Sequence, residues 1–338
     1  MRRIGLVLRI ITGVGLLSFL FYKTDIHALS DAVLRTTSNL PWVILGIALT
    51  FLGLLGGAVR WGRILAFQGF KFSTLKAAHI CFVGQFFNAF MLGSCGGDLV
   101  RAFYAGKDQR GKRTSAAMTV VMDRSIGLIT TIVFSCFMIL VRIHVFLDNQ
   151  GPRGTGILMV IFMIGTVLGL FVLFRKNVFE HFKFFQRIEN TTRIGALIRQ
   201  AYEVTFLYKR DRRVLLPAVM LSLLSLVLMT LSCWCFGQAI GLKVPIIDFF
   251  ALFPIITVLM SVPITPGSLG VREGLFVTMF GAVGVDSPNA ILMSLMVYAG
   301  GVFWSLFGGL LYVGFSSKPD RHMPAEFESL QKQQSVAD

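Results

Sequence analysis

Acidic residues are scarce in this sequence. Only 17 of its 338 residues are Asp or Glu, against 32 Lys or Arg, and charged residues of both signs make up 14% of the chain. Such a composition leaves more apolar surface than one water-soluble core can hide. The basic residues lie in loops between apolar blocks, which is the positive-inside pattern of membrane proteins. That placement argues against nucleic-acid binding, and we expect no nucleic-acid partner.

Cysteine and histidine are also rare, with five residues of each. The cysteines form no CxxC pair and have no histidine cluster to complete a site, so neither zinc binding nor a disulfide framework is predicted. Acidic residues in the expected outer loops are scattered rather than grouped. We therefore assign no catalytic residue, no metal ligand and no cofactor.

Long apolar runs are what the sequence has in abundance. Apolar residues account for 55% of the chain, and the mean hydropathy is +0.73. A run of roughly 20 apolar residues can cross a bilayer as one helix. The predicted fold is an all-α polytopic membrane protein with about seven or eight transmembrane helices plus re-entrant or broken helices. The candidate spans are 4–22, 42–60, 118–141, 156–174, 214–240 and 289–315, with a shorter candidate at 269–285.

The distribution of basic residues predicts the orientation of the chain. We expect a single transmembrane domain over 1–316 with a cytoplasmic N-terminus, followed by a polar tail at 317–338. The loop at 175–213 carries ten Lys or Arg against four acids. Its apolar residues recur at helical spacing, which predicts an amphipathic helix on the cytoplasmic lipid surface; a solvated connector is the alternative.

A short apolar segment at 77–92 lies between two basic loops, 60–76 and 101–117. If this segment crossed the membrane, one of the two loops would lie outside, against the positive-inside rule. It is therefore predicted to enter the membrane and return. Re-entrant backbone must be buried in protein or line a wet cavity, so the break that follows, "GSCGGDLVR" at 93–101, indicates a cavity.

A second break, "PITPGSLGVREG" at 263–274, follows another short apolar run at 248–262. Two Gly- or Pro-interrupted segments in corresponding places of two halves indicate an inverted repeat with a site between them. Chance similarity is the alternative. If the breaks meet, Arg101 should lie near Glu273, or Arg272 near Asp98, because an unpaired charge at that depth is costly.

Charges beside the first break suggest a head-group site. Asp98 and Arg101 share a helix face, and Gly97 would let the backbone approach a phosphate at the helix start. In the alternative reading, Asp98 is a helix N-cap and Arg101 an anchor at the membrane surface. Arg60 is likewise either a cavity residue or a snorkelling anchor beside an interfacial Trp61.

Further candidates come from the neighbouring helices and from the second break. Gln85 and Asn88 fall on one face of the re-entrant segment, where they line the cavity or bond to another helix. Asp123 is too short to snorkel and is predicted to be a buried functional charge, whereas the adjacent Arg124 can reach the interface. The second break contributes Pro266, Gly267, Gly270, Arg272 and Glu273, of which the last two could instead be an anchor and a helix-start acid.

Four segments carry a family resemblance. "AVRWGRIL", "FFNAFMLGSCGGDLVRAF", "AAMTVVMDRSIGLI" and "PITPGSLGVREG" resemble, in order and spacing, the motifs of the flippase-like family that includes the transmembrane domain of lysylphosphatidylglycerol synthetase. The resemblance covers about residues 40 to 315. The family's first break usually begins with proline-glycine, where this chain has Leu92-Gly93-Ser94-Cys95. The acid and the arginine that follow are in place.

The resemblance implies a multi-pass protein of the bacterial inner (cytoplasmic) membrane, with re-entrant helices and a cavity that handles lipid. The chain is similar to the stand-alone form, without a soluble synthetase domain. We expect it to translocate or handle a phospholipid, aminoacylated or anionic, or a lipid-linked head group, through a cavity formed by the two breaks. The alternatives are an integral-membrane transferase acting on a lipid carrier and a membrane scaffold. Homo-oligomer formation and a separate transferase partner stay open.

Overall fold

The computed structural model describes residues 34, 36–90, 96–107, 112–148, 150–174, 212–262, 265 and 268–316. All regular secondary structure in these residues is helical. The predicted span at 4–22, residues 175–211 of the predicted amphipathic loop and the tail at 317–338 lie outside them. The helices discussed below are α3 (Leu40–Phe67), α4 (Thr74–Phe90), α5 (Gly96–Lys107), α6 (Arg113–Val141), α7 (Ile143–Asp148), α8 (Gln150–Phe174), α12 (Arg212–Ile240), α13 (Ile246–Met260), α14 (Val271–Gly281) and α15 (Ser287–Ser316).

Four of the described helices are long and apolar enough to cross a membrane: α3, α6, α12 and α15. They contain the predicted spans 42–60, 118–141, 214–240 and 289–315, because a continuous apolar run of that length is a local feature of the sequence. α8 contains the fifth, 156–174. Their outer faces carry exposed large apolar side chains, as a lipid-facing surface requires. The chain is an integral, multi-pass membrane protein.

The shorter candidate span at 269–285 is not a span. Its helix, α14, has 11 residues. At a rise of 1.5 Å per residue this helix is roughly 17 Å long, about half the thickness of a hydrocarbon core. Gly270 at φ 80° precedes it and Gly284 at φ 84° follows it, so a left-handed glycine marks the turn on each side. α14 is instead the second arm of a short helical hairpin with α13.

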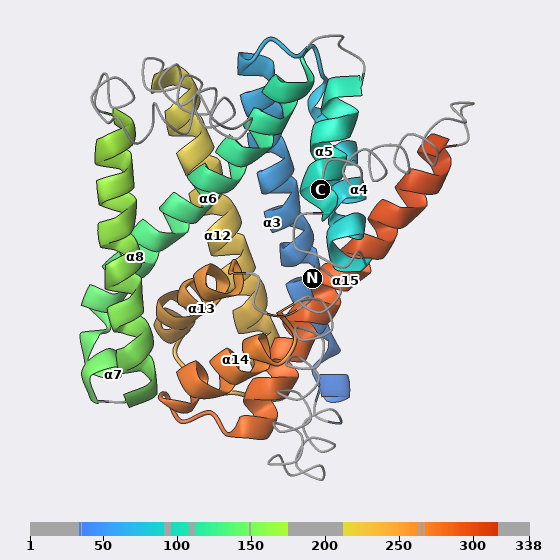
Figure 1. Cartoon of the computed structure of the whole chain (residues 1–338). Helices are drawn as coiled ribbons and strands as arrows, with labels where there is room; N and C mark the ends of the chain where they lie inside the picture. The colour runs from blue at the N-terminus through green and yellow to red at the C-terminus, as the bar shows by residue number, and fades with distance from the viewer. Residues whose placement is uncertain are drawn as a thin grey trace, which may run out of the picture.

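Two short hairpins lie at opposite ends of the bundle. α4 packs against α5, and α13 packs against α14. In Figure 1 the α4–α5 hairpin occupies the upper half of the molecule and the α13–α14 hairpin the lower half. Arms of 17, 12, 15 and 11 residues are all shorter than a transmembrane helix. The α4–α5 hairpin fits the predicted re-entrant element at 77–92. The α13–α14 hairpin is a second element of the same kind.

The two hairpins belong to two similar halves. Each half runs long helix, hairpin, long helix: α3, α4–α5, α6, and then α12, α13–α14, α15. The first long helices of the halves, α3 and α12, pack along each other. The last helix of each half packs on the hairpin of the other half, α6 on α13 and α15 on α4. Reciprocal contacts of this kind, with the hairpins at opposite ends, are what an inverted repeat produces.

Small residues bring the long helices close together. A Cβ at Gly56 of α3 would lie 2.5 Å from Ser225 Oγ of α12. A Cβ at Gly308 of α15 would lie 2.0 Å from the carbonyl oxygen of Phe82 in α4. Such contacts are favoured inside membranes because lipid tails give apolar side chains no extra reason to associate. The α15–α4 contact therefore depends on the absence of a side chain at Gly308.

We expect Gly308→Ala to destabilise the protein. The new methyl group cannot fit against the α4 backbone, so α15 must move, at a cost of about 1–3 kcal/mol. Gly301→Ala on the same helix is the matched control, because no heavy atom of the described residues lies within 4 Å of its Cβ position. Thermal unfolding in detergent should show a lower midpoint for the first variant only. Equal midpoints would contradict the close α15–α4 contact.

The hairpin geometry also predicts sidedness. Thr74 begins α4 and Lys107 ends α5, so cysteines at these exposed positions should react from the same side of the membrane. Lys243, in the exposed connection between α12 and α13, should react from the opposite side. Labelling with a membrane-impermeant maleimide, in a background without the native cysteines, measures all three. Opposite sidedness of positions 74 and 107 would show that the α4–α5 segment crosses the membrane.

Candidate functional site: a charged cavity at the first hairpin

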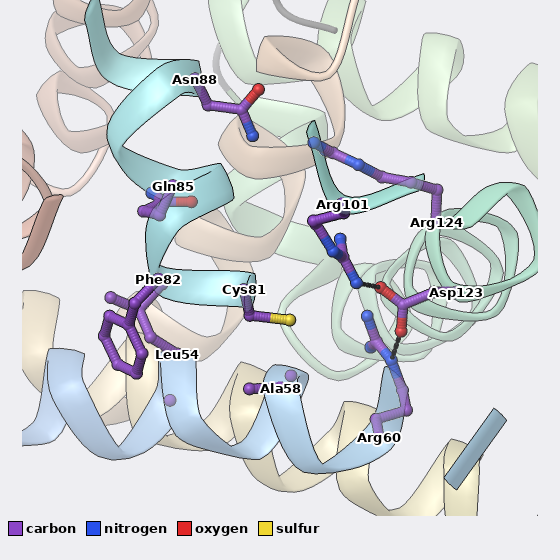
Figure 2. Close-up of a pocket in the computed structure, with 12 residues that line it drawn as sticks. Leu54, Ala58, Arg60, Cys81, Phe82, Gln85, Asn88, Arg101, Asp123 and Arg124 are labelled. Atoms are coloured by element: carbon purple, nitrogen blue, oxygen red, sulfur yellow. Dashed lines mark hydrogen bonds and ion pairs between the residues drawn. The ribbon is translucent and has the colours of Figure 1, made fainter. Parts of the chain in front are cut away.

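A cavity of about 210 Å³ lies between α3, α4, α5 and α6. Two long helices and both arms of the first hairpin form its walls, and Figure 2 shows their side chains converging on it. The cavity therefore lies beside the first break, as predicted, but no described residue of the second break lines it, so the expectation of a cavity formed by both breaks does not hold for this cavity. Six residues proposed from the sequence line it: Arg60, Gln85, Asn88, Arg101, Asp123 and Arg124.

Asp123 is the centre of the charged wall. Its side chain is 4% exposed, and its two oxygens accept hydrogen bonds from two arginines on different helices. Arg60 Nε of α3 donates to Oδ1 at 2.7 Å, and Arg101 Nη2 of α5 donates to Oδ2 at 2.8 Å (Figure 2). The carboxylate on α6 thus joins three helices. The prediction that Asp123 is a buried charge agrees with this burial.

Each arginine has a second contact that fixes its direction. Arg60 Nη1 donates to Ser222 Oγ of α12 at 2.8 Å. The guanidinium of Arg101 stacks over the ring of Trp61, 4.4 Å from the ring centroid, which favours a cation. Trp61 is fully buried, so it is not an interfacial residue, and Arg60 turns inward to Asp123 rather than outward to the membrane surface.

A second acid–arginine pair lies beside the first. Arg124 Nε donates to Asp98 Oδ2 at 2.8 Å, and Arg101 lies 3.5 Å from Asp98 Oδ1. The Arg124 side chain is 55% exposed, against 18% for Asp98. The charges therefore form a chain from the buried Asp123, through Arg101 and Asp98, to an accessible arginine. Because Asp98 accepts a hydrogen bond from Arg124 on another helix, its contacts are not limited to those of a helix N-cap.

Among the described residues, the charges around the cavity do not balance. Three guanidinium groups, from Arg60, Arg101 and Arg124, meet two carboxylates, from Asp98 and Asp123. Arg101 is 9% exposed, yet its Nε is buried without a hydrogen-bond partner in the described part of the chain. A buried donor of this kind costs free energy unless something accepts from it. The cavity wall therefore has capacity for an acceptor.

Gly97 has a different role from the one its sequence suggested. Its Cβ would lie 1.9 Å from the carbonyl oxygen of Gly84 in α4, so the missing side chain allows α5 to pack against α4. Its backbone N–H donates to Asn88 Oδ1 at 2.8 Å. Asn88 therefore satisfies one of the free amides at the start of α5 from the other arm of the hairpin. The prediction that Gly97 serves approach by a ligand is wrong at this amide.

The second break forms a separate, buried cluster. Gly270 N–H donates to Glu273 Oε2 at 2.7 Å, and the other oxygen of Glu273 pairs with the guanidinium of Arg272. Arg272 Nε also donates to Ser294 Oγ at 3.0 Å, and the guanidinium stacks 4.2 Å from the Tyr298 ring centroid. Arg272 is 2% exposed and Glu273 is fully buried. One arginine and one acid here balance each other.

The predicted charge pairing between the two breaks is therefore wrong. Arg101 pairs with Asp98 and Asp123, and Arg272 pairs with Glu273, so each break is neutralised within its own half. Adjacent residues seldom meet on a helix, but Glu273 folds back over the helix start to reach both Gly270 and Arg272. The remaining predicted residues of this break, Pro266 and Gly267, lie outside the described residues.

Two residues that contact the cavity arginines were not predicted from the sequence. Ser222 lies within a long apolar helix and carries no local signal; only the packing of α12 beside α3 brings it to Arg60. Trp61 stands next to Arg60 in a motif that did draw notice, but its role as the ring beneath Arg101 depends on the hairpin folding over it.

Fold and site together define a polytopic membrane protein with two oppositely placed helical hairpins and a charged intramembrane cavity at one of them. The chain belongs to the family described as the lysylphosphatidylglycerol synthase transmembrane region, whose model matches residues 6–308. A "UPF0104 membrane protein" of Pyrococcus horikoshii is 25% identical over 327 residues, covering 90% of this chain and 95% of that protein.

A second relative, a "UPF0104 membrane protein" of Methanothermobacter thermautotrophicus, is 22% identical over 321 residues, covering 90% of this chain and 93% of that protein. No solved structure matches the chain significantly.

We expect Asp123→Asn to destabilise the protein, because it leaves two inward-facing arginines without their shared charge. Breaking a buried ion pair from one side costs about 3–5 kcal/mol. Adding Arg60→Gln should restore part of this loss, because one of the two uncompensated charges is then removed. Thermal unfolding in detergent measures both variants, with Asp98→Asn as a control at the more exposed acid. If the double variant were less stable than the sum of the single variants, the shared-carboxylate account would fail.

Proposed function

We propose that the protein binds the phosphate-bearing head group of a membrane phospholipid in this cavity and moves the lipid across the membrane. The observation that carries the proposal is the excess of guanidinium groups in the described part of the cavity wall: Arg60, Arg101 and Arg124 against two carboxylates. A guanidinium donates two parallel hydrogen bonds to a phosphate. Within an apolar surrounding, the uncompensated positive charge favours entry of an anion.

The carboxylates add a preference for a head group that also carries positive charge. Asp98 lies toward the accessible end of the charge chain, with 18% of its side chain exposed, whereas Asp123 is saturated by two arginines. An ammonium group of a zwitterionic or aminoacylated lipid would thus meet Asp98. The description of the matching family, which names a lysylphosphatidylglycerol synthase, supports a lipid of this kind.

The two-half architecture suggests how a bound lipid moves. In inverted-repeat transporters the site lies at short, broken helices, and rocking of one half against the other exposes it to each side in turn. Here a phosphate would compete with Asp98 for Arg124, the exposed member of the chain. The basic loops support a cytoplasmic membrane location with the N-terminus on the cytoplasmic side.

Replacing the exposed arginine tests the proposal without disturbing the fold. Arg124→Gln removes one phosphate donor, and its partly exposed ion pair contributes little to stability. We expect phospholipid binding to weaken by about ten- to a hundredfold, the value of one charge-assisted hydrogen bond. Transfer of a labelled phospholipid between the leaflets of reconstituted vesicles should slow with it. Mass spectrometry of co-purified lipid measures the binding.

Arg63→Gln is the matched control, because Arg63 is an exposed arginine on the same helix as Arg60 and does not line the cavity. This variant should bind and transfer lipid like the unaltered protein. Equal lipid content and equal transfer rates for Arg124→Gln, Arg63→Gln and the unaltered protein would contradict the proposal.

A further inference from the structure

The cavity has an apolar end as well as a charged one. Beyond Ala58, its wall on α3 continues to Gly57, Leu54 and Gly53, and Phe82 of α4 faces them. Figure 2 shows Leu54 and Phe82 at one side and Asp123 at the other, with Ala58 and Arg60 between them along α3. A site for a small water-soluble anion would have no use for such an extension.

Gly57 is the informative residue at the apolar end. Two other glycines on this stretch of α3 are explained by packing: a Cβ at Gly53 would lie 3.0 Å from Met229, and one at Gly56 would lie 2.5 Å from Ser225. At Gly57, no described heavy atom lies within 4 Å of the Cβ position. Glycine in a helix interior is unfavourable relative to alanine, and here neither helix packing nor a positive φ requires it.

The space in front of Gly57 belongs to the cavity that the arginines line. Gly57 and Arg60 are three positions apart on α3, which is roughly 4.5 Å along a helix axis. The space at Gly57 is therefore close to the charged end of the same cavity. The buried Nε of Arg101, which has no hydrogen-bond partner among the described residues, independently indicates an acceptor at the charged end.

We propose that Gly57 keeps open a slot for the glycerol ester and the first methylene groups of an acyl chain, so that the cavity recognises the junction of head group and chain. The inference rests on the proposed function and narrows its ligand to a lipid rather than a free phosphate compound. A cavity of about 210 Å³ is smaller than the pockets that enclose drug-sized ligands, so the rest of the lipid lies outside it. Gly57 is thus a specificity-determining residue.

A native cysteine supplies the measurement. Cys81 of α4 lines the same cavity and is partly exposed, and Figure 2 shows its sulfur pointing toward Asp123, Arg60 and Arg101. With the other four cysteines replaced by alanine or serine, the rate at which Cys81 reacts with a maleimide reports whether the cavity is occupied. The two probes are a short-chain phosphatidylglycerol and sn-glycerol 3-phosphate, which has the phosphate without the chains.

In the otherwise unaltered protein, both probes should slow the labelling of Cys81. In Gly57→Leu, protection by the short-chain lipid should need at least about tenfold more lipid, because the leucine takes the place of about two methylene groups of the chain. Protection by glycerol 3-phosphate should be unchanged. Gly57→Ala should give an intermediate shift, and it guards against a leucine variant that fails to fold.

Gly301→Leu is the control, because its Cβ position is equally open and it lies on α15 away from the cavity. It should behave as the unaltered protein does with both probes. Equal protection of Gly57→Leu and the unaltered protein by the lipid would overturn the slot and leave the proposed function standing. Loss of protection by both probes in Gly57→Leu would also overturn it. Failure of both probes to protect the unaltered protein would overturn the proposed function.

Discussion

The carboxylate of Asp123 ties the first half of the molecule together. It lies on α6 and accepts from Arg60 on α3 and from Arg101 on α5, and Arg60 extends the connection to Ser222 on α12. Four helices therefore depend on one buried charge. Because either arginine alone would be an uncompensated charge in apolar surroundings, the hairpin arm α5 cannot leave its place without a replacement partner for Arg101. The same residues that line the cavity thus hold its walls.

The two halves share an architecture but differ in electrostatics. At the second hairpin, Arg272 and Glu273 form a balanced pair, and Ser294 and Tyr298 occupy the remaining faces of the arginine. At the first hairpin, three arginines of the described residues meet two acids, and Arg124 is accessible. A closed, neutral cluster needs no ligand, whereas an open, positively charged one can accept an anion. Under the proposed function, this asymmetry would place the binding site in the first half and leave a supporting role to the second.

The sequence predicts the features of the fold that depend on a local pattern of residues. Spans such as 42–60 and 214–240 follow from run length, and the hairpin at 77–92 follows from the basic loops on its two sides. Contacts between residues that are far apart in the sequence could not be predicted in this way. Whether Arg60 snorkels or turns inward is decided by an acid 63 residues away, and the need for glycine at position 97 is set by the backbone of Gly84 on the facing helix. The predicted pairing of Arg101 with Glu273 is wrong for the same reason. Arg101 pairs with Asp123 and Glu273 pairs with Arg272, so each charge is neutralised by a residue of its own half.

Arg101 contributes to the packing of the first hairpin and also has a donor that a ligand could use. Its guanidinium is held by Asp123, by Asp98 and by the face of Trp61, so little orientation is left to be lost when a ligand arrives. Its Nε nevertheless lacks an acceptor in the described residues. Such a group costs free energy in the empty cavity and gains when an oxygen accepts from it. If an anion binds there as proposed, it stabilises the folded protein by RT ln(1 + L/Kd), where L is the free anion concentration, which would couple the integrity of the first hairpin to the presence of the anion. A cavity built from charges that are fixed in place but incompletely neutralised is suited to hold a head group within a membrane that otherwise excludes it.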